Sequence, residues 1–147
     1  MSAIPAAAKG VAVHAELPAV LQALIATQAA IGAAGLDRKL THLVTLRASQ
    51  INQCGFCVKM HTKEARDEGE TNERLDRVIV WRHVSDFSPA EKAALAWTEA
   101  LTVIDTAADL GPLRVTLREH FTEQQIAALT ATIAMINLWN RVQIAAH

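Results

Sequence analysis

Residues 43–65 read LVTLRASQINQCGFCVKMHTKEA, and this stretch decides the predicted fold. Apolar side chains recur at spacings of three and four before and after residues 52–53, which predicts two helices joined by a short break. The second helix would open at Cys54. Cys54, Cys57 and His61 then stand at positions i, i+3 and i+7, so one helix face would carry two thiols and an imidazole.

The rest of the chain carries the same helical signals. Ser88-Pro89-Ala90-Glu91 combines a capping serine, a proline suited to the first helical position and a glutamate that can reach back to the cap. No stretch alternates apolar and polar residues for long enough to predict a strand. The sequence therefore predicts an all-α fold, a single-domain bundle of about six to seven helices. The expected helices cover residues 17–33, 37–51, 54–69, 71–85, 89–106, 113–120 and 122–143.

Length and composition limit the possible classes of protein. With 147 residues, the chain is the size of one domain. Its formal charge of -1, with 20% charged and 51% hydrophobic residues, is not that of a disordered or nucleic-acid-binding chain. Residues 17–36 carry no charge but contain proline, glycine and glutamine, so we expect no membrane span.

The N-terminal segment has no recognisable targeting pattern. Residues 1–14 are rich in alanine and lack a basic region followed by a compact apolar run, so we expect no secretion signal and a cytoplasmic protein. We expect these residues to form a loose tail, with residues 15–147 as the folded domain.

The last expected helix, residues 122–143, carries apolar side chains on more than one face. A helix that is apolar nearly all round is normally buried on all sides, which a domain of this size seldom achieves alone. We therefore expect a homo-oligomer. The alternative is a helix at the centre of a monomeric bundle.

The two cysteines are placed for thiol chemistry. A free thiol has a pKa of about 8.5, and the free N–H groups and dipole of a helix N-terminus stabilise its thiolate. His61 lies one turn after Cys57 and could take its proton. We therefore expect Cys57 to attack a hydroperoxide and Cys54 to resolve the sulfenic acid to a disulfide. The same pair could instead exchange with a partner's disulfide.

Two other interpretations of the cysteine pair remain open. Free cysteines are often inert core residues. A structural zinc site normally needs four ligands, whereas only Cys54, Cys57 and His61 cluster here. A zinc-stabilised or redox-sensing oligomer that binds a partner protein is therefore a non-enzymatic alternative. The remaining histidines show no paired spacing: His14, His42, His83, His120 and His147.

Beyond these local signals, the chain resembles a known family over residues 37–143. The C-x-x-C-x-x-x-H core within residues 43–65, Gly69-Glu70-Thr71, Trp81-Arg82, the helix from Ser88 and the closing segment 137–141 resemble the alkylhydroperoxidase D core of the carboxymuconolactone decarboxylase superfamily. The resemblance implies an all-α fold, trimers or hexamers, and a peroxidase or disulfide-reductase activity.

The resemblance also implies roles and partners. The second cysteine of the motif attacks, the first resolves and the histidine belongs to a proton relay, which gives these roles to Cys57, Cys54 and His61. The partners would be a small-molecule hydroperoxide and an external thiol or dithiol reductant protein. We expect no haem, flavin or metal, and the sequence has no glycine-rich phosphate loop that would indicate a nucleotide cofactor.

Two positions depart from the family pattern. Members usually carry a relay glutamate twelve residues before the first cysteine, where this chain has His42. A histidine can also transfer protons near neutral pH, so His42 is a candidate relay residue, with an ordinary surface or core histidine as the alternative. The founding type has a histidine between its cysteines, where this chain has Phe56. A lactone decarboxylase of the same superfamily is the other enzymatic alternative, and the cysteine pair argues against it.

Large and charged side chains outside the motif are first interpreted structurally. Trp81, Trp97 and Trp139 are expected to be core or interface residues, because burial alone explains apolar rings. Arg47, Asn140 and Arg141 are expected to bind a helix terminus or a neighbouring subunit.

Overall fold

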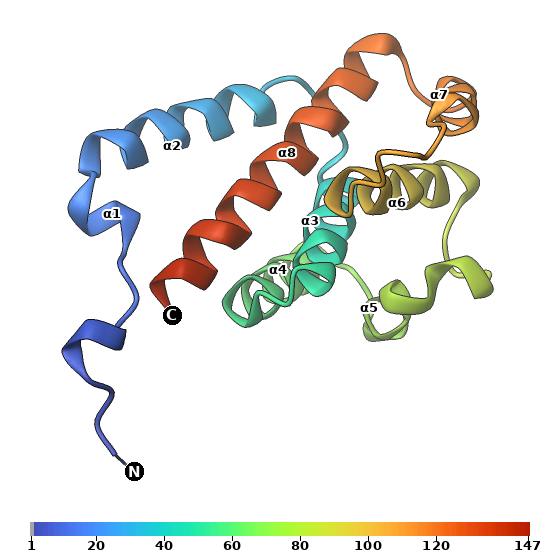
Figure 1. Ribbon diagram of the computed structural model, residues 1–147. Helices are drawn as coiled ribbons and strands as arrows, with labels where there is room; N and C mark the ends of the chain where they lie inside the picture. Colours follow the sequence, from blue (N-terminus) through green and yellow to red (C-terminus); the bar gives the residue numbers. More distant parts are fainter. Residues whose placement is uncertain (1) are drawn as a thin grey trace.

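The computed structural model describes residues 2–147, which fold as α-helices, 3-10 turns and loops without a strand (Figure 1). The all-α, single-domain prediction is confirmed. Eight α-helices are present in the described residues, and the one that the sequence did not predict, α1, is a single turn. The elements are η1 Ala6–Ala8, α1 Val13–Glu16, α2 Pro18–Gly32, α3 Arg38–Ile51, α4 Gly55–Asp67, α5 Asn72–Arg77, η2 Val78–His83, α6 Pro89–Thr102, α7 Gly111–Arg118 and α8 Glu123–Ala146.

Side-chain caps fix most of the helix starts. Ser88 and Thr122 form complete capping boxes with the side chains three residues later. Each such cap contributes about 1 kcal/mol by satisfying N–H groups that the helix leaves free. The residues whose side chains accept a hydrogen bond from the first turn of the following helix are Asp37, Cys54, Thr71, Ser88 and Thr122.

The expected helix over residues 71–85 is wrong as a continuous α-helix. α5 ends at Arg77, η2 follows as a 3-10 segment, and Val80 within it has non-helical backbone angles. Consecutive β-branched residues, Val78, Ile79 and Val80, disfavour continuation of an α-helix because their side chains crowd the preceding turn. The helix expected to end near residue 106 ends at Thr102, again before a β-branched pair.

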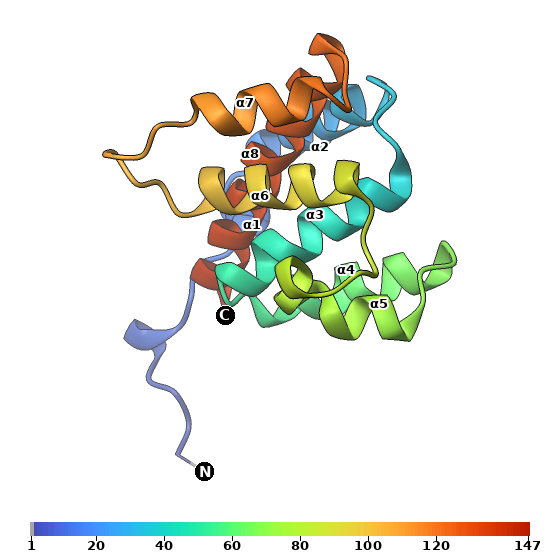
Figure 2. The ribbon, with the colours of Figure 1, turned by 90° about the vertical axis from the view of Figure 1, so that its right-hand side faces the viewer.

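α3 lies at the centre of the bundle and packs against α4, α6 and α8 (Figure 2). Two neighbouring faces of α3 enter two hydrophobic clusters. The first joins α3, α6, α7 and α8 through Leu40, Val44, Ala93, Ala94, Trp97, Leu117, Leu129 and Ile133. The second joins α3 and α6 to α4, α5 and η2 through Leu43, Leu46, Ala65, Leu75, Val78, Trp81, Phe87 and Leu95.

A partly buried carboxylate ties α3 and α6 to η2. Glu99 of α6 accepts hydrogen bonds from Arg47 Nε at 3.0 Å, from Trp81 Nε1 at 2.9 Å and from Arg82. Burial raises the pKa of Glu99, but the hydrogen bonds from Arg82, Trp81 and Arg47 outweigh burial and hold it below its ordinary value. Arg47 therefore binds a carboxylate within the chain, where the sequence had indicated a helix end or a neighbouring subunit.

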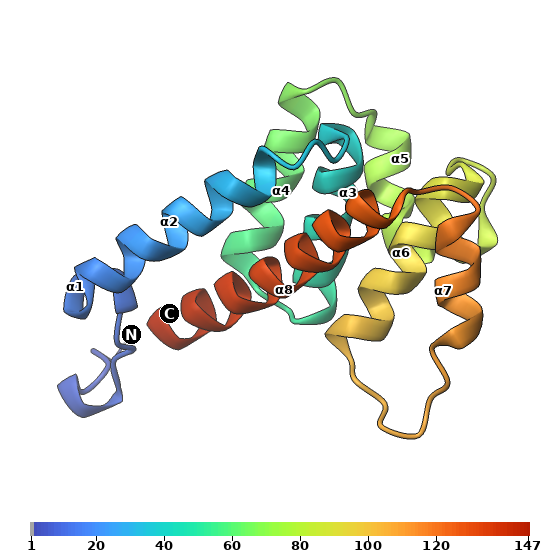
Figure 3. The ribbon, with the colours of Figure 1, turned by 90° about the horizontal axis from the view of Figure 1, so that it is seen from above.

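α2 differs from the other long helices because none of its residues is buried. It runs beside α8, away from α6 and α7, and α1 lies at its N-terminal end (Figure 3). Trp139 of α8 donates a hydrogen bond from Nε1 to Oε1 of Gln28 at 3.0 Å, which links the two helices. α2 and α8 thus form two walls of the cavity described below.

The N-terminal segment also reaches α8. The backbone N–H of Val11 donates to the carbonyl of Ala145 at 3.2 Å, and a Cβ at Gly10 would meet the same oxygen at 2.6 Å. That residues 1–14 form a loose tail stays a prediction, as does the expected homo-oligomer. Among residues 2–147, no helix is long and apolar enough to cross a membrane.

Candidate active site

Cys54 is the N-cap of α4, and Cys57 is the third residue of that helix. The Sγ of Cys54 accepts a hydrogen bond from the backbone N–H of Cys57 at 3.3 Å. The helix thus begins one residue later than predicted, and Cys54 occupies the position that serine or aspartate takes at other helix starts. Both sulfur atoms lie where the N-terminal dipole of α4 favours negative charge.

The two cysteines are joined as a disulfide, with their Cα atoms 5.3 Å apart. Both are shielded from solvent, with 2% of Cys54 and 1% of Cys57 exposed. They differ in what they face: Cys57 lines the main cavity of the protein, and Cys54 is absent from its walls. A small molecule in the cavity would meet Cys57 first.

A network of partly buried amides holds the loop before Cys54. Asn52 Nδ2 donates to the side-chain oxygens of Asn137 and Asn140, each at 2.9 Å, and Asn140 Nδ2 donates to Ser49 Oγ at 3.0 Å. The backbone N–H of Cys54 donates to the carbonyl of Ser49 at 3.1 Å. Asn140 therefore binds the end of α3 and the loop that follows, within the same chain, which positions Cys54.

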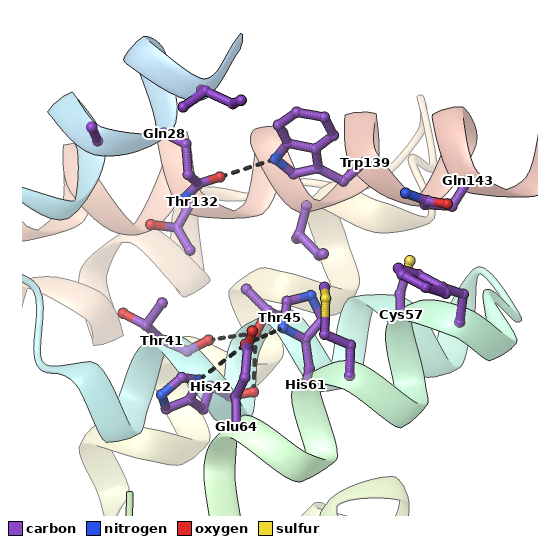
Figure 4. Close-up of a pocket in the computed structure, with 15 residues that line it drawn as sticks. Gln28, Thr41, His42, Thr45, Cys57, His61, Glu64, Thr132, Trp139 and Gln143 are labelled. Atoms are coloured by element: carbon purple, nitrogen blue, oxygen red, sulfur yellow. Dashed lines mark hydrogen bonds and ion pairs between the residues drawn. The ribbon is translucent and has the colours of Figure 1, made fainter. Parts of the chain in front are cut away.

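The cavity lies between α2 and α8 on one side and α3 and α4 on the other, and has a volume of about 710 Å³ (Figure 4). Its ionisable groups, His42, His61 and Glu64, lie on α3 and α4, and its other polar side chains come from α2, α3 and α8. Its lining residues are Ile25, Gln28, Ala29, Thr41, His42, Thr45, Phe56, Cys57, Met60, His61, Glu64, Thr132, Ile136, Trp139 and Gln143.

His61 lies in the cavity wall one turn after Cys57, as the spacing predicted. Its Nδ1 is 3.1 Å from Oε2 of Glu64 (Figure 4). Burial lowers the pKa of His61 below its ordinary value, and Glu64 offsets only part of this effect. The imidazole is therefore mainly neutral at pH 7 and can accept a proton.

His42 joins the same cluster from α3. Its Nδ1 lies 4.0 Å from Oε2 of Glu64, and its Nε2 lies 3.4 Å from Oε2 of Glu68. Nε2 is buried and makes no well-formed hydrogen bond. Arg38 binds Glu68 through Nε at 2.9 Å, and this hydrogen bond holds the pKa of Glu68 below its usual range.

Of the four predicted site residues, Cys54 is bonded to Cys57, and Cys57, His61 and His42 line the cavity. Sequence reasoning missed Glu64 as a site residue. Its spacing of three from His61 was the available signal. The contact of Glu64 with His42 could not be found in this way, because it depends on how α3 packs against α4.

The tryptophans divide between core and cavity. Trp81 and Trp97 are buried, as expected, whereas Trp139 lines the cavity. Phe56, between the two cysteines, is half exposed and stacks on His147.

Within residues 2–147, no group of three or more His, Cys, Asp or Glu side chains has an arrangement that could hold a metal ion.

Comparison with known proteins places this site in a family. The Carboxymuconolactone decarboxylase family matches residues 4–100. The uncharacterized protein YdfG of Bacillus subtilis is 40% identical over 110 residues, which cover 75% of each chain.

Solved structures of similar sequence have the same fold as this chain. A protein of unknown function from Agrobacterium tumefaciens, for which the role of antioxidant defence protein AhpD has been suggested, superposes with a TM-score of 0.88 at 34% identity over 94% of both chains. An uncharacterized peroxidase-related protein from Ralstonia eutropha with an alkylhydroperoxidase AhpD core gives a TM-score of 0.76 at 25% identity, over 88% of this chain and 69% of that one. The chain belongs to the carboxymuconolactone decarboxylase family and has the AhpD-like all-α fold.

Proposed function

We propose that this protein is a thiol-dependent peroxidase and disulfide reductase that reduces hydroperoxides through Cys57 and Cys54. One observation carries the proposal: the two sulfurs are paired at the N-terminus of α4, and only Cys57 opens onto a cavity that also contains His61. The suggested antioxidant role of the Agrobacterium relative is in keeping with it.

In the first step, the Cys57 thiolate attacks the distal oxygen of the hydroperoxide. An S–O bond forms, the O–O bond breaks, and the leaving alkoxide takes a proton to become an alcohol. The Cys57 sulfenic acid then reacts with the Cys54 thiol, which forms the disulfide and releases water. A dithiol reductant supplies two electrons and two protons to restore both thiols.

We assign the proton transfers to His61, assisted by Glu64 and His42. Neutral His61 takes the proton of the Cys57 thiol and returns it to the alkoxide, so no net proton is consumed. Glu64 stabilises the imidazolium through Nδ1, at 3.1 Å. His42 takes the place of the relay glutamate and lies between Glu64 and Glu68, so the carboxylates of this relay come from α4 and from the residue that follows it.

The partners follow from the same chemistry. The oxidant would be a small-molecule hydroperoxide, and the electron donor an external thiol or dithiol protein. We place the reaction in the cytoplasm, where such donors are kept reduced. We also propose a homo-oligomer, a trimer or hexamer, in which the uncharged and unburied helix α2 contributes to the contact.

Steady-state turnover tests this proposal. Purified protein with a dithiol donor should consume a hydroperoxide and the dithiol in a one-to-one ratio. The Cys57→Ser variant should show no turnover, and the Cys54→Ser variant, without the donor, should stop at the sulfenic acid after one equivalent of peroxide. Equal turnover by both variants and the native chain would contradict the cysteine mechanism, and decarboxylation of a lactone by the double serine variant would favour the decarboxylase alternative.

A further inference from the structure

The ring of His42 faces a carboxylate on each side. Its Nδ1 lies 4.0 Å from Oε2 of Glu64, and this oxygen is shared with Nδ1 of His61 at 3.1 Å (Figure 4). Its Nε2 lies 3.4 Å from Oε2 of Glu68. A neutral imidazole carries one N–H, so His42 can donate to only one of the two carboxylates. The nitrogen that carries the hydrogen therefore decides how His42 acts on Glu64.

The two tautomers of His42 have different consequences for the relay. With the hydrogen on Nδ1, His42 donates to Glu64 and only stabilises the charge of that carboxylate. With the hydrogen on Nε2, Nδ1 keeps its lone pair and can accept a proton that Glu64 receives from His61. Only the second tautomer extends the proton path beyond Glu64.

Glu68 favours this second tautomer. Glu64 alone would attract an N–H to Nδ1, but Glu68 lies closer to the ring and competes from the other side. Arg38 binds both oxygens of Glu68, and this contact holds the pKa of Glu68 below its usual range. Glu68 is therefore an ionised carboxylate at neutral pH, which only accepts hydrogen bonds.

Nε2 of His42 needs a partner because it is buried. Its contact with Glu68 is not aligned well enough to form a hydrogen bond in the structure, and a buried polar atom without a partner is unfavourable. Glu68 follows the last residue of α4 and is partly exposed, so its side chain can turn toward the ring. Hydrogen bonds of this kind are often loose in a resting enzyme and tighten during the reaction.

The neighbouring elements bring no competing charge to His42. The cavity walls on α2 and α8 consist of uncharged residues, and Glu99 of α6 binds Arg47 of α3 and Arg82 of η2. Within residues 2–147, the titratable or charged groups that face His42 are Glu64, Glu68, His61 and, through Glu68, Arg38.

We infer that Glu68 and Arg38 are positioning residues of the proton relay: Glu68 accepts the hydrogen on Nε2 of His42, and Arg38 holds Glu68 in place. The inference rests on the proposed function and deepens it. The proton of the Cys57 thiol moves to His61, and through Glu64 it can reach Nδ1 of His42. It returns along the same path to the leaving alkoxide, so no net proton is consumed.

The tautomer of His42 tests the role of Glu68 without any measurement of activity. The ¹⁵N chemical shifts of the ring, recorded above the usual titration range of imidazole, report which nitrogen carries the hydrogen. We expect Nε2–H in the native chain and mainly Nδ1–H in Glu68→Ala. Glu68→Gln keeps an acceptor oxygen and should retain much of the native tautomer. Glu68 lies beyond the end of α4 and is partly exposed, so both variants should fold.

Arg38→Gln and Lys39→Gln form a matched pair. Both residues are exposed in the first turn of α3, and each change removes one positive charge, but only Arg38 binds Glu68. Arg38→Gln should increase the fraction of Nδ1–H, and Lys39→Gln should leave it unchanged. Equal effects of the two variants would show that Arg38 does not hold Glu68 for this purpose.

Peroxide reduction gives the second readout. Glu68→Ala should lower kcat/KM for a hydroperoxide by about tenfold at neutral pH, part of the roughly 10²–10⁴-fold that general acid–base catalysis supplies. Glu68→Gln should recover most of this loss. Asp67→Ala, at an exposed neighbour that pairs with Lys63, should react like the native chain.

The two readouts separate this inference from the proposed function. A native chain with the hydrogen of His42 on Nδ1, or a Glu68→Ala variant that keeps the native tautomer, would overturn the inference whatever the activity. The expected change of tautomer in a protein that does not reduce peroxides would contradict the proposed function and would support the positioning of His42 by Glu68.

Discussion

Nδ1 of His61 lies 3.1 Å from Oε2 of Glu64, one helical turn further along α4. This contact gives the site a carboxylate on the same helix as the cysteines. Burial lowers the pKa of His61, and the hydrogen bond and charge of Glu64 act in the opposite direction. The balance leaves a neutral imidazole one turn from Cys57, oriented by its neighbour.

Replacing Glu64 by glutamine should shift the pH dependence of peroxide reduction. The Glu64→Gln change removes the charge that stabilises the imidazolium, so the pKa of His61 falls further. The acid limb of kcat/KM against pH, where His61 becomes protonated, should therefore move to lower pH. At neutral pH the rate should fall by about tenfold, part of the roughly 10²–10⁴-fold that general acid–base catalysis supplies.

The matched control is Asp67→Asn. Asp67 lies one turn after Glu64 on α4, but it is exposed and pairs with Lys63 at 2.6 Å. Its neutralisation should leave the acid limb in place. If the acid limb of kcat/KM does not move in Glu64→Gln, or moves equally in both variants, Glu64 is not part of the proton relay.

The His42→Glu variant, which restores the glutamate usual in the family, should shift the acid limb in the opposite direction to Glu64→Gln. The charge of a protonated His42 lowers the pKa of His61. His42→Glu replaces it by a negative charge, so the pKa of His61 should rise and the acid limb should move to higher pH. NMR titration of the His61 ring measures this shift directly, and His42→Gln should give a smaller shift in the same direction. An unchanged pKa of His61 in His42→Glu would show that the two residues are not coupled, and a downward shift would contradict the expected sign.

Glu99 should matter for stability. It accepts three hydrogen bonds in a partly buried position, from Arg47, Trp81 and Arg82, and Glu99→Gln removes its charge and replaces one acceptor oxygen by an NH2 group that faces a donor. We expect a loss of about 2 kcal/mol in the free energy of unfolding in urea at pH 7.

The pH dependence gives the sign of this contribution. The pKa of Glu99 is lowered in the folded chain, so its stabilising effect is present above the unfolded value of about 4.3 and is lost as the pH falls through the folded value. The difference between the native chain and Glu99→Gln should therefore shrink in acid. The exposed Glu123, paired with Arg118, is the control: Glu123→Gln should unfold like the native chain. A difference that persists undiminished below both pKa values would contradict the account.

Asn140 should affect both stability and the reactivity of Cys54. Asn140→Ala leaves a small cavity and removes one partner each from Asn52 and Ser49, which should cost about 2 kcal/mol of unfolding free energy. Because Ser49 and Asn52 hold the loop before Cys54, disulfide formation after peroxide attack should also slow. Asn72→Ala, at an exposed helix start, should change neither measurement. Normal resolution by Cys54 in Asn140→Ala would show that the amide network is structural only.

Much of the fold was readable from local signals. The capping signal at Ser88 predicted the start of α6, and the helices expected from residues 37, 71 and 122 do begin there, each after a capping side chain. The break at η2 was missed because apolar spacing continues through residues 75–82 while β-branching opposes the helix. Propensity and periodicity conflict there, and tertiary packing of Trp81 decides the outcome.

The site was only partly readable, for a physical reason. Cys54, Cys57, His61 and Glu64 lie on or beside one helix, so their spacing alone places them together. The contacts of His42 with Glu64 and Glu68 join α3 to α4, and Gln28 meets Trp139 across more than a hundred residues. Such contacts depend on packing between helices, which no spacing within one segment encodes.

The most direct test of the central claim is a count of free thiols before and after one equivalent of an organic hydroperoxide is added to the reduced protein. We predict rapid loss of both thiols in the native chain, no peroxide-dependent reaction in Cys57→Ser, and a sulfenic acid trapped by a dimedone probe in Cys54→Ser. Slow and equal oxidation of Cys54 and Cys57 would contradict the assignment of Cys57 as the attacking sulfur, and with it the proposed peroxidase.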